Sequence, residues 1–247
     1  MIKKPSGFII YRGPSLINGA PIVAVAITKS RNAKTGNMVQ TYILADNGMS
    51  PVESAKSLAD EAICGSCPHR RGLGGSCYVN LGQGPRSVMD SVQRGIYPMG
   101  LENAAQESSG RMVRLGTYGD PAAVPVAIWE ALLESAAGHT GYTHQWREFR
   151  GMQGVRFMAL LMASADNPAD RLEAKSRGYR TFRIMPSHHE PMAGEFTCPA
   201  SAEAGKKKTC AECGACNGGV NKARKADPVI VVHGALASRF KVEQALA

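Results

Sequence analysis

The chain has 247 residues, 44% of them hydrophobic, and carries a net charge of +9 from 29 Lys and Arg against 20 Asp and Glu. This length suits one α/β domain, and the longest apolar runs, residues 21–27 and 229–232, are far shorter than the roughly 18 residues that cross a bilayer. The sequence therefore predicts no transmembrane helix. No apolar signal segment follows the N-terminal lysines, so we expect a cytoplasmic location.

Strands and helices are predicted to alternate along most of the chain. Residues 8–12 and 21–28 predict a β-hairpin, and residues 39–45 predict a strand. A helix is predicted to follow and to run to about residue 62, because Ser50-Pro51-Val52-Glu53 is a capping box with proline at the first helical position. The remaining strands are predicted at 111–118, 141–146, 157–163, 179–185 and 229–232, and the remaining helices at 85–94, 101–108, 124–137, 167–178 and 238–246.

This alternation favours parallel strands with helices outside them. We predict a (β/α) barrel, complete, distorted or incomplete, with an open doubly wound sheet as the alternative. The chain is predicted to form one domain over residues 1–247. Within it, residues 1–37 form a basic N-terminal hairpin and loop, and residues 187–226 form a cysteine-rich metal-binding insertion.

Basic charge is concentrated in two segments. Residues 1–45 contain six Lys or Arg and no acidic residue, and residues 200–226 contain six basic and two acidic residues. Two such segments on one face would attract a polyanion, for which DNA is the natural candidate, although solvated surface lysines are the simpler explanation. The predicted nucleic-acid-binding residues are Lys29, Arg31, Lys34, Lys206, Lys207 and Lys208.

Four of the seven cysteines fall within nineteen residues, in a polar, glycine-containing loop: Cys198, Cys210, Cys213 and Cys216. Thiolates at Cys-x-x-Cys spacing are ligands of structural zinc and of iron–sulfur clusters. We predict a metal site, with zinc preferred because the loop lacks the apolar surroundings of a redox cluster, and a 4Fe-4S cluster as the alternative. Buried free thiols or a disulfide are the remaining explanations.

The other three cysteines predict a weaker, second metal site in a glycine-rich loop. Cys64, Cys67 and Cys77 lie near His69, and these four residues could form a site of their own or complete the first. Structural thiols and a catalytic thiol are the alternatives. The Cys-x-x-x-Cys-x-x-Cys spacing of radical S-adenosylmethionine enzymes is absent.

Polar residues follow several predicted strands. In a barrel the carboxyl ends of all strands meet on one face, where catalytic residues lie. The residues at or just beyond these ends are Asp46, Asp120, His144, Asp166, His188 and His233, any of which could instead serve as a cap or a turn former. Asp120 stands out because Gly119 and Pro121 constrain the backbone on either side of it.

Three segments carry a resemblance to a known group of proteins: residues 114–121 (Arg-Leu-Gly-Thr-Tyr-Gly-Asp-Pro), 141–146 (Gly-Tyr-Thr-His-Gln-Trp) and the cysteine loop from Cys198-Pro199 to Cys216-Asn217-Gly218. They resemble segments of small cysteine-rich bacteriophage proteins, mostly of unassigned function. That family is distantly similar to the phage DNA 7-deazaguanine transglycosylases, relatives of tRNA-guanine transglycosylase.

The resemblance implies a zinc-bearing barrel enzyme, a pentosyltransferase that exchanges guanine in phage DNA for a free 7-deazaguanine base in the cytoplasm of the infected host. One aspartate attacks C1′ of the sugar and a second handles proton transfer or base recognition. It implies Asp120 as nucleophile and Asp166 as the second aspartate, and His144 completes the predicted catalytic set. The zinc site of that family uses Cys-x-Cys-x-x-Cys and a histidine, a spacing that this chain does not have.

Two other functions fit the sequence. An iron–sulfur protein with redox or radical chemistry on a nucleic acid or nucleotide would use the same cysteines as cluster ligands. A non-catalytic, zinc-stabilised nucleic-acid-binding protein would need the basic segments and none of the aspartates at strand ends. The sequence does not indicate an oligomeric state.

Overall fold

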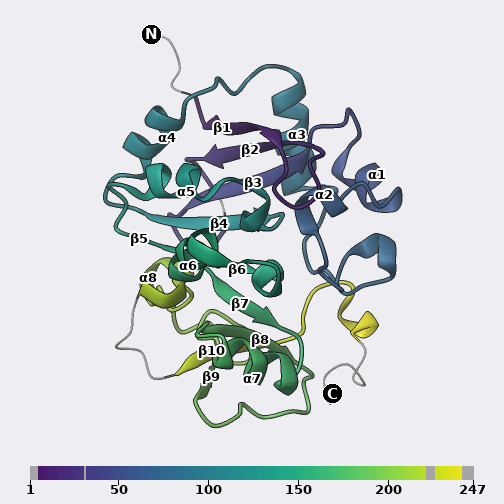
Figure 1. Ribbon diagram of the computed structural model, residues 1–247, viewed down its shortest axis with the longest axis vertical. Coiled ribbons are helices and arrows are strands. Elements are labelled where there is room, and N and C mark those ends of the chain that lie inside the picture. The colour runs from purple at the N-terminus through teal and green to yellow at the C-terminus, as the bar shows by residue number, and fades with distance from the viewer. Residues whose placement is uncertain (1–4, 31, 221–225, 241–247) are drawn as a thin grey trace.

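The computed structural model describes residues 5–30, 32–220 and 226–240. Their strands form two five-stranded sheets (Figure 1). The first sheet has the order β1 (Gly7–Pro14), β2 (Pro21–Ile27), β3 (Val39–Ala45), β4 (Met112–Tyr118), β5 (Gly138–Thr140). The second has the order β6 (Tyr142–Thr143), β7 (Met162–Ala165), β8 (Thr181–Met185), β10 (Asp227–Val231), β9 (Glu195–Thr197).

The first sheet is mixed. The predicted hairpin of β1 and β2 is confirmed as an antiparallel pair, β3 pairs antiparallel with β2, and β4 and β5 continue in parallel. Strands β2 and β3 are almost fully buried, as expected for central strands covered on both faces. The helices of this half are α1 (Pro51–Lys56), α2 (Glu61–Cys64), α3 (Gly84–Gln93), α4 (Leu101–Ser108) and α5 (Val126–Leu133).

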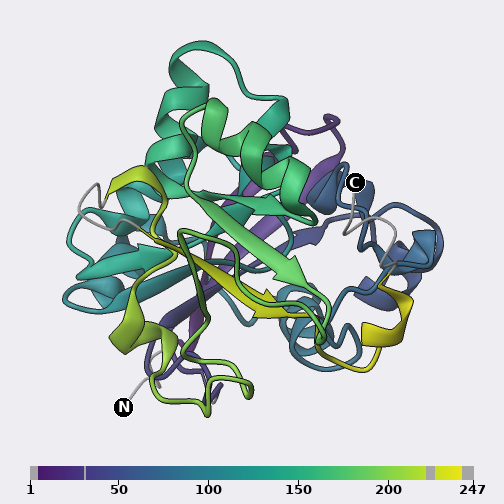
Figure 2. The ribbon, with the colours of Figure 1, turned by 90° about the horizontal axis from the view of Figure 1, so that it is seen from below.

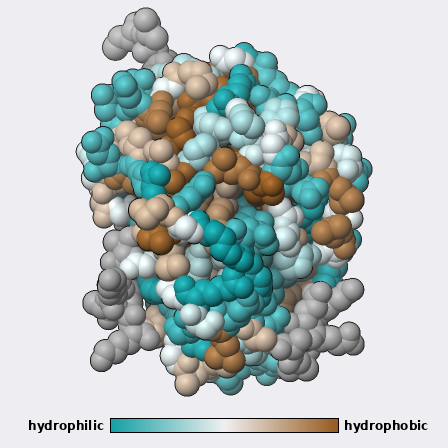
Figure 3. All heavy atoms as spheres, viewed as in Figure 1, coloured by the Kyte–Doolittle hydropathy of each residue, from teal (hydrophilic) through white to brown (hydrophobic). Residues whose placement is uncertain are grey.

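The second sheet is parallel throughout. Helices α6 (Gly151–Leu160) and α7 (Pro168–Ser176) lie on one side of it, and the segment that carries α8 (Cys210–Cys213) lies on the other (Figure 2). Mostly hydrophilic side chains cover the lower half of the face in Figure 3, where this sheet and α7 lie. Of the described helices, none is long and apolar enough to cross a membrane.

The two sheets meet at Gly141. Strand β5 ends at Thr140 and β6 begins at Tyr142, so the chain passes from one sheet into the other within one residue. A Cβ atom on Gly141 would lie 2.7 Å from Leu161 Cδ2 and 3.0 Å from Leu115 Cβ, so only glycine fits between these neighbours. Residues that follow β4 of the first sheet and β7 of the second come together beyond this junction, because Asp120 and Asp166 both contact His144.

The α/β class is confirmed, but the described strands do not close into a barrel. Strands β1 and β9 remain the outer edges of two separate sheets, and the antiparallel β1 and β2 take the place of further strand–helix units. The predicted strand at 157–163 is wrong, because α6 continues to Leu160 and β7 starts at Met162. The helix predicted to run to residue 62 ends at Lys56, because the backbone leaves the helical region at Leu58, where φ is +64°. The predicted helix at 238–246 lies mostly outside the described residues.

Candidate functional site

Three of the predicted strand-end residues meet in space. Asp120 follows β4, His144 follows β6 and Asp166 follows β7. The backbone N of His144 donates to Asp120 Oδ2 at 2.8 Å, and His144 Nε2 lies 3.3 Å from Asp166 Oδ1. The expected convergence of these residues is therefore confirmed, and their catalytic role stays a prediction.

Backbone N–H groups fix the direction of the Asp120 carboxylate. Its Oδ1 accepts a hydrogen bond from the N of Ala122 at 3.0 Å, as N-cap of the short turn Pro121–Ala123, and its Oδ2 accepts the bond from His144. Burial raises the pKa of Asp120, while hydrogen bonds from Ala122 and Thr143 act in the opposite direction. The side chain lies in the wall of a cavity, with 7% of the residue exposed.

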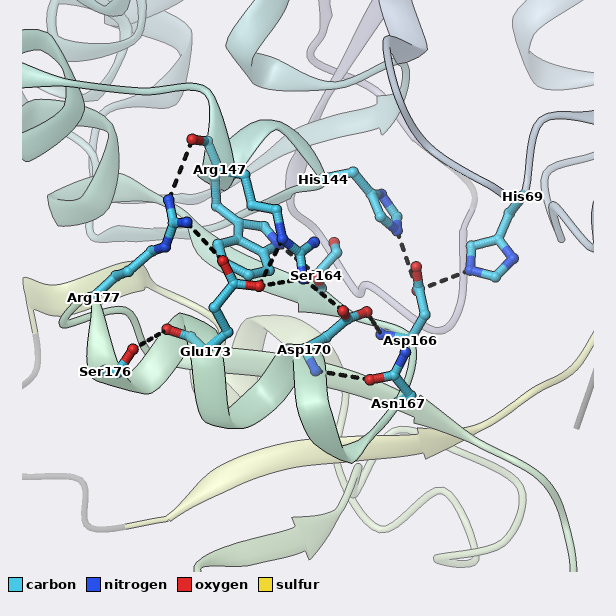
Figure 4. A network of polar contacts seen from close by, with 11 residues as sticks. His69, His144, Arg147, Ser164, Asp166, Asn167, Asp170, Glu173, Ser176 and Arg177 are labelled. Atoms are coloured by element: carbon cyan, nitrogen blue, oxygen red, sulfur yellow. Dashed lines mark hydrogen bonds and ion pairs between the residues drawn. The ribbon is translucent and has the colours of Figure 1, made fainter. Parts of the chain in front are cut away.

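Asp166 lies between two histidines. His69 Nε2 is 2.9 Å and His144 Nε2 is 3.3 Å from the same oxygen, Oδ1, and both rings point at it (Figure 4). Burial alone would raise the pKa of Asp166, but the charge of His144 and the hydrogen bonds from both rings hold that pKa well below its usual range. Burial alone would lower the pKa of His144, but Cys67 and Asp166 together raise it well above its usual value.

A glycine-rich turn positions His69. The N of Cys77 donates to the carbonyl of His69 at 2.9 Å, which closes the loop and places Ser76 Oγ 2.9 Å from His69 Nδ1. A Cβ on Gly75 would stand 2.3 Å from the carbonyl carbon of His69, so the loop can close this tightly only with glycine there. The turn thus fixes the ring so that Nε2 faces Asp166.

The predicted second metal site is rearranged in the structure. Cys67 and His69 face residues of the second sheet, with Cys67 Sγ 3.9 Å from His144 Nε2. Cys64 and Cys77 lie in the wall of the same cavity, and burial raises the pKa of both thiols. The sequence could not show that His144 and Asp166 would join this group, because both residues follow strands of the second sheet and lie far along the chain from this loop.

The four-cysteine loop lies against the amino end of β6. The carbonyl of Cys216 accepts a hydrogen bond from Gly141 N at 2.8 Å, and Cys198 packs in a cluster with Ile230. Burial and the neighbouring cysteines raise the pKa of Cys216. All four cysteines of this loop line the cavity, as do Cys64, Cys67 and Cys77.

Within the described residues, one group of three or more His, Cys, Asp or Glu has all its ligand atoms within 4.8 Å of one another: His69, His144 and Asp166. No three sulfurs of the four-cysteine loop lie this close to one another. Four thiolates around one zinc ion would stand about 3.8 Å apart, so a single zinc ion would require the loop to contract.

The cavity lies between the two sheets and has a volume of about 490 Å³. Arg114 of β4 reaches into it and donates from Nη2 to the hydroxyls of Tyr78 at 2.7 Å and Tyr142 at 3.0 Å. Tyr142 stacks on Phe182 of β8, with 4.7 Å between ring centroids. Sequence reasoning missed Arg114, although a charged residue in the middle of a predicted strand is a usable signal.

No family model, curated protein or solved structure matches this chain. The resemblance to phage transglycosylases stays a prediction.

The two basic segments adjoin in the structure. The N of Cys210 donates to the carbonyl of Lys34 at 3.0 Å, and Lys34 lines the cavity. Lys29 is exposed, as are the three lysines 206–208, while Arg31 lies outside the described residues. This contact places Lys34 beside the cysteine loop, and nucleic-acid binding remains a proposal.

The other strand-end residues lie apart from the Asp120–Asp166 group. Asp46 pairs with Arg12, with 2.9 Å between its Oδ2 and the arginine Nε, outside the cavity. His188 contacts the neighbouring His189 edge to face, with 4.5 Å between ring centroids. His233 lines the cavity and its Nδ1 lies 3.0 Å from the carbonyl of Val231.

Proposed function

We propose that this protein is a nucleic-acid base-modifying enzyme and that the cavity between its sheets takes the reacting nucleotide. The observation that carries this proposal is the hydrogen-bonded series Asp120–His144–Asp166 in the cavity wall. Two carboxylates and an imidazole at adjoining strand ends are groups that can attack carbon and move protons. The cavity volume of about 490 Å³ falls in the range of small-molecule sites.

The charge of Arg114 supports a substrate with phosphate groups. Among the described residues, its side-chain hydrogen bonds run to two tyrosine hydroxyls, which leave its positive charge uncompensated by a carboxylate. A guanidinium of this kind binds phosphate oxygens well. The stacked rings of Tyr142 and Phe182 offer an apolar surface beside it, and Lys34 adds a second positive charge to the cavity.

For the reaction we propose exchange of guanine for a free 7-deazaguanine base. The Asp120 carboxylate attacks C1′ of the sugar, the C1′–N9 bond breaks, and the departing guanine takes up a proton. The incoming base then loses its N9 proton, attacks C1′ and releases Asp120. Asp166 and His144 carry the proton, and a base in a duplex must first be flipped out of the stack.

The test is transfer of labelled free guanine into DNA, which needs no knowledge of the natural base. Wild-type protein should incorporate the label, and Asp120→Asn should abolish incorporation while the fold survives. Asp46→Asn is the matched control, because Asp46 also follows a parallel strand but pairs with Arg12 outside the cavity. Absence of exchange in both DNA and RNA, or full activity of Asp120→Asn, would refute the proposal.

A second candidate is an iron–sulfur protein with redox or radical chemistry on a nucleotide. The observation that favours it is that all seven cysteines line one cavity, without the sulfur spacing that a single ion requires. The sulfurs that hold an iron–sulfur cube surround several iron atoms and stand further apart than those around one zinc ion.

Metal content and absorbance of protein purified without oxygen separate the two candidates. Iron and sulfide with a broad visible absorption band would favour the cluster, and Cys213→Ser should then lose that band. Zinc without visible absorption would favour the transglycosylase. In that case the exchange assay decides the function.

A further inference from the structure

We infer that His69, His144 and Asp166 bind one divalent transition-metal ion, with Cys67 beside them as a fourth candidate ligand. The inference does not rest on the proposed function, because metal binding can be measured without any nucleic acid. The site differs from both metal sites that the sequence predicts, since it combines ligands from the Cys67–His69 turn with residues that directly follow two strands of the second sheet.

The distances are close to those between ligands of one metal ion. Nitrogen and oxygen ligands 2.0–2.1 Å from a tetrahedral zinc ion stand about 3.3 Å apart, and a thiolate stands about 3.5 Å from an imidazole nitrogen. The corresponding separations are 2.9 Å for His69 to Asp166, 3.3 Å for His144 to Asp166 and 3.9 Å for Cys67 to His144. Shifts of a few tenths of an ångström would bring these pairs to coordination geometry.

The orientation of the rings supports ligation. Both imidazoles direct Nε2 toward the same carboxylate oxygen, so their lone pairs can meet at one point (Figure 4). His69 Nδ1 is 2.9 Å from Ser76 Oγ, and metal-binding histidines commonly use the second nitrogen in such a hydrogen bond, which fixes the ring and its tautomer. All three side chains are largely buried, with 13% exposed for His69, 21% for His144 and 13% for Asp166.

The ligand set indicates the class of metal. Two imidazoles and one carboxylate suit zinc or iron(II) and leave coordination positions free, as in catalytic sites. The ligand atoms of the three residues lie within 4.8 Å of one another, a group that does not include Cys67, so the thiol is a neighbour that can complete the site or give way to water. Because these residues line the cavity, the free position faces a bound substrate.

The ion would change one part of the proposed mechanism. As ligands, Asp166 and His144 hold the metal and are not free to carry a proton, whereas Asp120 touches this group only through the backbone N of His144. Proton transfer would then fall to water in the free coordination position. Zinc analysis measures metal binding, and the labelled-guanine assay measures base exchange. The two experiments thus distinguish failure of the metal site from failure of the proposed function.

Zinc is the probe for the test. Protein stripped with a chelator is dialysed against Zn²⁺, freed of excess metal and analysed for bound zinc per chain. Wild type should hold one more zinc than His69→Gln or Asp166→Asn, and this difference is unaffected by any zinc in the four-cysteine loop. His233→Gln is the matched control, because His233 lines the same cavity but bonds to Val231. It should keep the wild-type content.

A measurement on the unaltered chain guards against variants that fail to fold. The chain has six histidines, whose ring protons can be followed by NMR during a zinc titration. We expect the signals of two histidines to shift and to lose their dependence on pH as one equivalent binds. Equal zinc in wild type and both variants, or a titration that leaves every histidine signal unchanged, would overturn the inference. Binding of Fe²⁺ by the same residues would support the site and change only the identity of the metal.

Discussion

Glu195→Gln tests how the second sheet is held together. The Glu195 side chain is fully buried between two arginines, with Oε2 2.6 Å from Arg183 Nη2 and Oε1 3.1 Å from Arg171 Nε. The substitution leaves two cations, 2% and 7% exposed, without their carboxylate. Breaking a buried ion pair in this way costs about 3–5 kcal/mol, which for a chain of this size lowers the melting temperature by roughly 6–20 °C.

The matched control is Glu173→Gln. Glu173 also binds two arginines, Arg147 and Arg177, but its side chain is 37% exposed. Water screens this charge, so the loss should be at most about 1 kcal/mol. Urea and thermal unfolding followed by circular dichroism measure both variants. Equal, small losses for the two substitutions would show that burial of Glu195 does not have the energetic effect argued from the structure.

Two further substitutions test the local geometry. Gly119→Ala should cost about 1–3 kcal/mol, because φ is +80° and a Cβ would stand 2.7 Å from Ile43 Cβ; unchanged thermal stability would contradict this. Burial lowers the pKa of His139, whose Nε2 bonds to the carbonyl of Leu160. The imidazole therefore takes up a proton more readily in the unfolded chain than in the folded chain. Wild-type stability should therefore fall as pH drops below about 6.5, and His139→Gln should remove that part of the loss. Parallel stability curves for wild type and variant between pH 7 and 5 would rule out this contribution.

Local signals in the sequence predicted local structure well. The capping box at Ser50 and Glu53 starts α1, and Asn167 caps α7 with Pro168 at its first position, as expected. The rule that polar residues at parallel strand ends gather at one edge predicted the meeting of Asp120 and Asp166. These predictions succeeded because each depends on a few neighbouring residues or on strand direction alone.

Features that depend on contacts between distant residues were not predicted. The chain passes from one sheet to the other at Gly141, where Leu115 and Leu161 pack against the glycine, and no short pattern encodes these contacts. The pairing of His69 with Asp166 joins residues 97 positions apart. The sequence assigned these two to different sites, one metallic and one catalytic, because spacing along the chain does not measure distance across a cavity.

The position of Gly141 also bears on the order in which the chain folds during synthesis. All strands of the first sheet lie before this residue, so that half can assemble while the remainder is still being made. The second sheet must wait, because β10, the last strand among the described residues, inserts between β8 and β9. The hydrogen bond from Gly141 N to the carbonyl of Cys216 also forms late, because Cys216 is synthesised long after Gly141. Completion of the junction, closure of the cysteine loop and assembly of the cavity are thus one late event, and a nascent chain released before β10 would retain the first sheet without the cavity.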